Sequence, residues 1–216
     1  MHNSVKNLIY IEELIKSKVN HDKLTKIIAV SKTFPIENVL PLIEHGQLHF
    51  GENKVQEALD KWSDIKVKND AIKLHLIGRL QTNKVKFALR IFDYIHSLDG
   101  EKLATKISEE QVKQEKKPKI FIQVNIGNES QKSGINKDNL ADFYIFCKNL
   151  HLDIIGTMCI PPNDGNAEKY FSQMNKINQE LNFKELSMGM SEDYLVAIKN
   201  NATYVRVGSK IFGNRT

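Results

Sequence analysis

The sequence predicts an α/β protein, namely a single-domain (β/α)8 barrel of the TIM type with an extra N-terminal helix, over residues 1–216. Strand-like and helix-like segments alternate from residue 27 onward, which is typical of a parallel sheet covered by helices. About eight such units favour a closed barrel, because barrels of roughly 200–250 residues often form one domain. An open doubly wound sheet is the alternative, because periodicity does not show closure.

The individual elements follow from local patterns. Residues 1–18 have the pattern of an amphipathic helix and not of a signal peptide, because lysines and glutamates interrupt the apolar residues. Short apolar runs, several of them rich in β-branched residues, predict strands at 27–31, 47–51, 73–77, 94–98, 119–126, 153–160, 185–188 and 203–207. Helices are predicted at 35–45, 54–62, 83–92, 101–114, 137–150, 167–181 and 192–200, and residues 210–213 close the chain.

Composition excludes several classes of protein. No stretch approaches the roughly 20 apolar residues of a membrane span. The net charge of +5 is spread over the chain without interleaved aromatic residues, so a nucleic-acid partner is not expected. Cys147 and Cys159 lack zinc-finger or CxxC spacing, which predicts reduced core thiols and a cytoplasmic protein.

One lysine stands at the predicted end of the first strand. Lys32 follows the apolar run of residues 27–30 and precedes the helix that Pro35 introduces. It is either solvated at the barrel mouth or held there for chemistry. A partly desolvated lysine has a lowered pKa, and its free amine can condense with a carbonyl.

The ends of the last two predicted strands suggest a phosphate site. Residues 186–191 and 207–209 are small, bear hydroxyl groups and contain glycine, and barrels often bind phosphate at this place. Either segment alone is explained as well by turns and a helix cap, but both together beside Lys32 favour phosphate. Arg206 can donate to a pyridine nitrogen, with an ion pair at the rim as its alternative. These features together suggest pyridoxal 5′-phosphate bound as a Schiff base.

Three histidines lie on neighbouring predicted strands. His49, His75 and His96 could suggest a metal site. However, the sequence has no His-x-His pair here and no strand-end aspartate to complete a ligand set, so packing and hydrogen bonding are favoured and no metal is expected.

The chain resembles the pyridoxal phosphate homeostasis protein family, whose barrel is similar to the N-terminal domain of alanine racemase. The resemblance rests on segments that run in family order at residues 29–33, 49–57, 75–84, 124–125, 131–134, 156–162, 186–191 and 205–213. It implies pyridoxal 5′-phosphate bound to Lys32 as an internal aldimine, with Arg206 facing the pyridine nitrogen and Asn53 near the ring. Ser187, Gly208 and Ser209 would hold the phosphate.

The resemblance also implies a function. Family members are thought to buffer and deliver the cofactor inside the cell, with pyridoxal phosphate-dependent apo-enzymes as recipients, and are not known for robust turnover. A pyridoxal phosphate-dependent amino-acid racemase is the alternative, but it needs a second base, which the resembling enzymes take from a further C-terminal domain. A Schiff-base aldolase would need a strand-end carboxylate or tyrosine, and none is evident. No catalytic residue is therefore expected, and a monomer is predicted.

Overall fold

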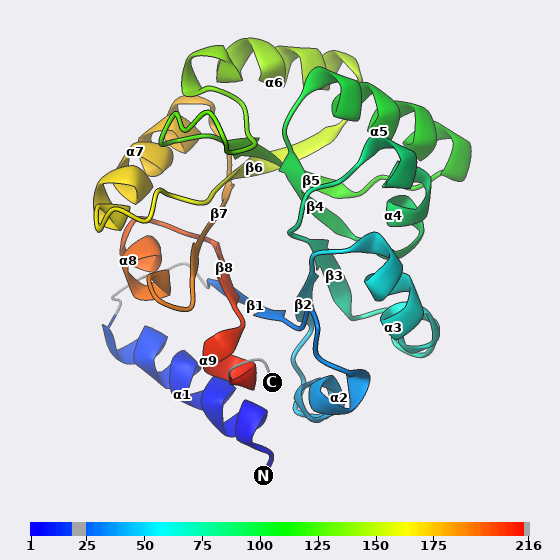
Figure 1. Cartoon of the computed structure of the whole chain (residues 1–216), viewed down its shortest axis with the longest axis vertical. Helices are drawn as coiled ribbons and strands as arrows, with labels where there is room; N and C mark the ends of the chain where they lie inside the picture. Colours follow the sequence, from blue (N-terminus) through cyan, green and yellow to red (C-terminus); the bar gives the residue numbers. More distant parts are fainter. Residues whose placement is uncertain (19–24, 214–216) are drawn as a thin grey trace.

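The strands form a closed barrel in the computed structural model, which describes residues 1–18 and 25–213 (Figure 1). Each strand pairs in parallel with the next, and the last pairs with the first, so the closed-barrel prediction is confirmed and the open sheet is wrong. The strands within the described ranges are β1 (Lys26–Val30), β2 (His49–Glu52), β3 (Lys73–Leu76), β4 (Tyr94–Leu98), β5 (Lys119–Val124), β6 (Asp153–Cys159), β7 (Glu185–Met190) and β8 (Tyr204–Val207).

The helices surround the barrel on the outside (Figure 1). The predicted helices at 83–92 and 137–150 each begin with a 3-10 turn, η1 (Thr82–Lys84) and η2 (Lys137–Asn139). The third helix continues past its predicted end at Trp62, because Ile65 extends its apolar face against the core. The α-helices are α1 (Asn3–Lys18), α2 (Ile36–Glu44), α3 (Val55–Lys68), α4 (Val85–Ile91), α5 (Glu101–Gln114), α6 (Leu140–Asn149), α7 (Ala167–Glu180), α8 (Tyr194–Lys199) and α9 (Ser209–Phe212).

The extra N-terminal helix packs against the end of the chain. Leu8 and Ile11 of α1 are buried, and the Asn7 side-chain amide donates a hydrogen bond of 3.0 Å to the carbonyl of Ile211 in α9. Figure 1 shows α1 lying beside α9 below the first and last strands. The first helix therefore braces the short helix that follows β8.

The seventh strand is longer than the sequence indicates. It passes through Gly189, whose φ is +88° and whose added Cβ would lie 2.5 Å from the Cβ of Ala197. Only glycine fits both conditions, so this residue permits a distorted strand and does not end it. The pairing of β7 with β8 shifts register between Ser187 and Met190. Ser187 consequently lies inside the strand and not at its end.

The interior of the barrel and the layer between strands and helices form separate apolar regions. Inside the barrel, the buried apolar side chains are those of Ile28, Tyr94, Phe121, Met158 and Tyr204. The two cysteines are buried and unpaired, as predicted. No described helix is long and apolar enough to cross a membrane.

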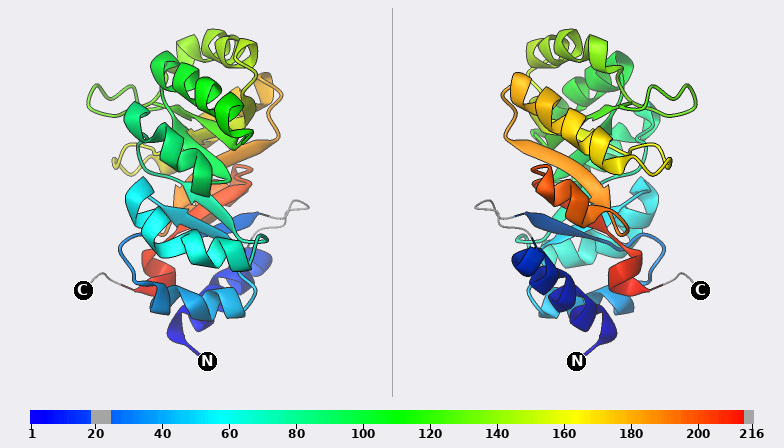
Figure 2. Two further views of the ribbon diagram at one scale, coloured as in Figure 1. Left: turned by 90° about the vertical axis from the view of Figure 1, so that its right-hand side faces the viewer. Right: turned by 90° about the vertical axis from the view of Figure 1, so that its left-hand side faces the viewer.

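Figure 2 shows that the segments following β5 and β6 project on the same side of the barrel as α9. This side holds the carboxyl ends of the strands, where parallel barrels gather their functional residues. The segments after β5, β6 and β8 therefore lie at the same mouth of the barrel.

Candidate functional site

A cavity of about 910 Å³ opens at the carboxyl ends of the strands. Five of the six residues that the sequence predicted line it together, and they come from three separate segments of the chain. They are Lys32, Asn53, Arg206, Gly208 and Ser209. The structure thus brings an amine, a guanidinium, an amide and a glycine–serine turn to one place.

The residues on both sides of Lys32 are held in place. The Ser31 hydroxyl donates a hydrogen bond of 2.7 Å to Glu52, and the Ser31 carbonyl accepts one of 2.9 Å from Lys61. The N–H of Thr33 donates to Glu57. Thr33 has a φ of +69°, a left-handed conformation that is unfavourable for a β-branched residue. The loop that carries Lys32 is therefore fixed in a strained shape by side chains outside the cavity.

The network below this loop joins one buried cation to a buried and a partly exposed carboxylate. Lys61 Nζ lies 2.9 Å from Glu52 and 3.3 Å from Glu57. Burial raises the pKa of Glu52, although Lys61 and the indole N–H of Trp62 act in the opposite direction. At Glu57 burial also acts to raise the pKa, but the Thr33 N–H and Lys61 outweigh it and lower the pKa. Glu57 therefore stays ionised and accepts strongly from the loop backbone.

Arg206 lies at the floor of the cavity and is only 5% exposed. Its Nη1 donates to Ser187 Oγ at 2.7 Å and its Nη2 to the Cys159 carbonyl at 2.9 Å. Burial lowers its pKa, and the Asp193 carboxylate opposes this shift. Within the described chain, Arg206 makes no ion pair with a carboxylate. The alternative of a rim ion pair is therefore wrong, and a buried cation faces the cavity.

Ser187 does not lie where the sequence placed it. Because β7 continues to Met190, the Ser187 side chain is fully buried in the barrel interior, bonded to Arg206 and 2.9 Å from His96 Nδ1. It is not among the residues that line the cavity. Ser191, the second serine of the same segment, lines the cavity and accepts a hydrogen bond of 3.2 Å from the N–H of Gly208. Ser191 thus joins the ends of the last two strands.

Asn53 is positioned by a close approach of two strand ends. A Cβ on Gly78 would lie 2.3 Å from the carbonyl oxygen of Asn53, so only glycine allows the segments after β2 and β3 to pack this closely. Asn53 is half-buried and reaches the cavity from the β2 side.

Some residues that line the cavity have no role in the sequence-based prediction. Lys132, from the segment after β5, lies 2.6 Å from Glu129 and donates to the Pro161 carbonyl at 3.2 Å. Phe34, which follows the lysine loop, stacks on Phe212 of α9 at a centroid distance of 4.9 Å. The contacts of Lys132 with Pro161 and of Phe34 with Phe212 join segments far apart in the chain, so local patterns could not reveal them.

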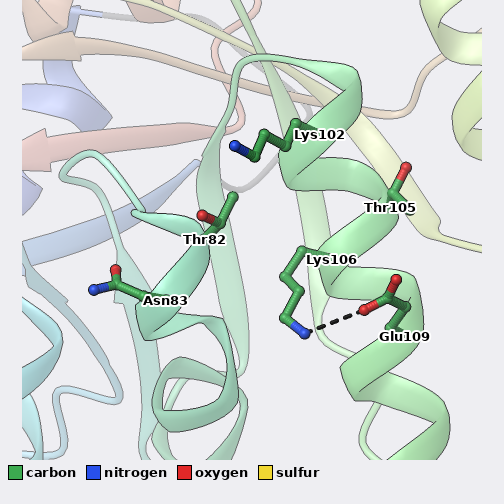
Figure 3. Close-up of a pocket in the computed structure, with 6 residues that line it drawn as sticks. All are labelled: Thr82, Asn83, Lys102, Thr105, Lys106 and Glu109. Atoms are coloured by element: carbon green, nitrogen blue, oxygen red, sulfur yellow. Dashed lines mark hydrogen bonds and ion pairs between the residues drawn. The ribbon is translucent and has the colours of Figure 1, made fainter.

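A second hollow of about 470 Å³ lies between η1 and α5 (Figure 3). Figure 3 shows Lys106 of this hollow reaching Glu109 on the same helix, at 3.1 Å. The hydrogen bonds that Lys106 donates to Glu110 and Glu109 raise its pKa, so this amine stays protonated and is a poor nucleophile. The hollow is therefore a weaker candidate than the cavity at the strand ends.

Comparison with known proteins agrees with this geometry. The family described as alanine racemase, N-terminal domain, matches residues 11–216. The pyridoxal phosphate homeostasis protein of Pasteurella multocida is 38% identical, over 97% of this chain and 96% of its own length. The protein of the same name from Aquifex aeolicus is 36% identical, over 90% of this chain and 89% of its own.

The chain belongs to the pyridoxal phosphate homeostasis protein family. Among solved structures, it is similar to PipY of Synechococcus elongatus, at 31% identity. Without pyridoxal phosphate, PipY superposes with a TM-score of 0.88, covering 98% of this chain and all of PipY. With pyridoxal phosphate bound, the TM-score is 0.86 over 97% of this chain. The family assignment made from sequence motifs is thus confirmed.

Proposed function

We propose that this protein binds pyridoxal 5′-phosphate covalently through Lys32 and acts in cofactor homeostasis, without robust catalysis. The observation that carries the proposal is the buried guanidinium of Arg206, which faces the same cavity as Lys32 and has no carboxylate partner in the described chain. A buried cation without a counter-ion is costly, so the cavity is suited to a ligand that accepts from it. PipY, a relative at 31% identity, has been solved with pyridoxal phosphate bound.

The residues around the cavity fit the three chemical parts of the cofactor. Lys32 Nζ supplies the amine for the aldehyde carbon. Ser191, Ser209 and the backbone N–H groups near Gly208 supply donors for the phosphate, and Ser191 takes the place first assigned to Ser187. Arg206 donates to the ring nitrogen and, because guanidinium does not deprotonate, leaves that nitrogen unprotonated. Bound in this way, the cofactor is a weaker electron sink than when a carboxylate faces its nitrogen.

The lining of the cavity also favours a carrier over a racemase. A racemase that uses two bases needs a second group besides the lysine to exchange a proton at the substrate carbon. Among the described residues that line the cavity there is no tyrosine or histidine; the carboxylates are Glu192 and Asp193, and Asp193 accepts a hydrogen bond from the N–H of Met190. The amine of Lys132 is engaged by Glu129 at 2.6 Å and by the Pro161 carbonyl. We infer a monomeric cytoplasmic protein that supplies the cofactor to apo-enzymes.

Absorbance spectroscopy tests the covalent link. The purified protein, incubated with pyridoxal phosphate and desalted, is expected to retain a visible absorbance band that Lys32→Ala lacks. Lys132→Ala is the matched control, because it removes an amine from the same cavity and should keep the band. Far-ultraviolet circular dichroism checks that each variant folds. A colourless wild-type protein would contradict the proposal, and substantial alanine racemisation by the loaded protein would contradict the carrier role.

A further inference from the structure

A line of polar side chains crosses the interior of the barrel from Arg206 to the opposite mouth. Ser187 Oγ lies 2.9 Å from His96 Nδ1, and His96 Nε2 lies 2.9 Å from His75 Nδ1. His75 Nε2 lies 2.9 Å from His49 Nδ1, and His49 is the first residue of β2, at the amino-terminal end of the barrel. We call Ser187, His96, His75 and His49 the histidine chain. The expected role of these histidines in hydrogen bonding is confirmed.

The histidine chain is enclosed by aromatic rings. The His75 ring stacks on Tyr94 at a centroid distance of 4.2 Å, and the His96 ring stacks on Phe121 at 4.3 Å. Both imidazoles are fully buried, and burial lowers their pKa well below 6.5. They are therefore neutral near neutral pH, and each has one N–H donor and one acceptor nitrogen.

The hydrogen bonds of the histidine chain can run in only one direction if every donor and every hydroxyl has a partner. Arg206 is a donor only, so Ser187 Oγ accepts from it at 2.7 Å. The other described partner of this hydroxyl is His96 Nδ1, which must therefore accept the Ser187 hydrogen. His96 then carries its proton on Nε2 and donates to His75, which donates to His49 in the same way. Every donor in the chain points away from Arg206.

We propose that the histidine chain positions Arg206 and stabilises its charge in place of a carboxylate. The aligned groups turn their acceptor ends toward the guanidinium, and successive hydrogen bonds strengthen one another in a low-dielectric interior. A carboxylate would compete with the ligand for the guanidinium, whereas neutral dipoles leave its remaining N–H groups available to the cavity. The histidine chain does not conduct protons to or from the cavity, because the Arg206 guanidinium does not release a proton. The part of this inference that concerns the ligand rests on the proposed function.

Nuclear magnetic resonance tests the direction of the chain without any cofactor. The sequence has seven histidines and four arginines, so selective ¹⁵N labelling gives few side-chain signals to assign. We expect His49, His75 and His96 to be neutral and protonated on Nε2, and the Arg206 guanidinium signals to show slow exchange with water. In Ser187→Ala, Arg206 should exchange faster. Protonation of His96 or His75 on Nδ1, or a mixture of tautomers, would overturn the proposed direction.

A pair of variants tests the positioning role. His75→Phe keeps an aromatic ring against Tyr94 but interrupts the histidine chain at a residue three hydrogen bonds away from Arg206, outside the cavity. We expect pyridoxal phosphate to bind several-fold more weakly, up to about tenfold, the loss typical of one neutral hydrogen bond, and Arg206 to exchange faster. Tyr94→Phe removes a hydroxyl from the same layer without interrupting the chain and should bind as the wild type does.

The outcomes separate the two proposals. If the wild-type protein fails to bind the cofactor, the proposed function fails, while the tautomers and the Arg206 exchange still decide whether the chain positions the arginine. If His75→Phe binds as tightly as the wild type and leaves Arg206 exchange unchanged, the positioning role is overturned. Ser187→Ala replaces His75→Phe in both measurements if the latter does not fold.

Discussion

Acid should destabilise this protein through the histidines inside the barrel. Burial keeps His75 and His96 neutral in the folded state, whereas both become protonated on unfolding below the ordinary histidine pKa of about 6.5. The unfolded state then binds more protons than the folded state, so the free energy of unfolding falls as the pH falls. Burial and the neighbouring cations Lys26 and Lys73 likewise lower the pKa of His49 to about 4, against the opposing fields of Asp93 and Glu185.

The magnitude follows from the number of buried imidazoles. Between about pH 7.5 and about pH 5.5, each histidine that stays neutral in the folded state contributes a loss of about 1.4 kcal/mol. His75 and His96 together should therefore lower the free energy of unfolding by about 3 kcal/mol. His49 adds less than a full share because it is half-buried. Glu52 acts in the opposite direction, because its raised pKa stabilises the folded state as the pH falls.

Urea unfolding of the ligand-free protein at both pH values measures this loss. Since other groups also titrate, the decisive quantity is the difference between the wild type and His75→Phe, which should lose about 1.4 kcal/mol less over the interval. His45→Gln, which removes an exposed histidine, controls for the change in composition. An equal loss in the wild type and in His75→Phe would refute the reasoning, because His75 would then carry the same protons in both states.

Three further predictions concern the parts that support the cavity. Gly78→Ala should cost about 1–3 kcal/mol of stability in urea unfolding, because its Cβ would collide with the Asn53 carbonyl; an unchanged midpoint would contradict this. Thr33→Gly should stabilise the protein by about 1 kcal/mol in the same assay, by relieving a left-handed conformation, and any loss would show that the conformation is not strained. Glu57→Gln should cost about 1–2 kcal/mol at neutral pH and less in acid, where the lost carboxylate would be protonated anyway; a cost independent of pH would refute the role of its charge.

Local patterns predicted the barrel because each strand and helix has its own periodicity, and they placed Lys32 correctly because the apolar run before it ends abruptly. Ser187 lies inside a strand and not at the expected strand end, because a glycine at position 189 is typical of a turn, whereas here its positive φ lies within a strand that continues. The contact of His75 with His96 depends on neighbouring strands pairing in a particular register, which sequence periodicity does not contain. The position of a side chain within its own segment could thus be predicted from the sequence in most cases. Its hydrogen-bond partners on neighbouring strands could not.

Two buried cations beside the cavity are stabilised in different ways, and the difference matches their positions. Lys61 forms ion pairs with Glu52 and Glu57, and these pairs hold the loop that carries Lys32. Arg206 is held by neutral groups, so its charge remains for whatever enters the cavity. If Lys61 had only neutral partners, the loop that carries Lys32 would be held less firmly. If Arg206 had a carboxylate partner, that carboxylate would compete with the ligand for the guanidinium. The site therefore needs one cation that is neutralised and one that is not.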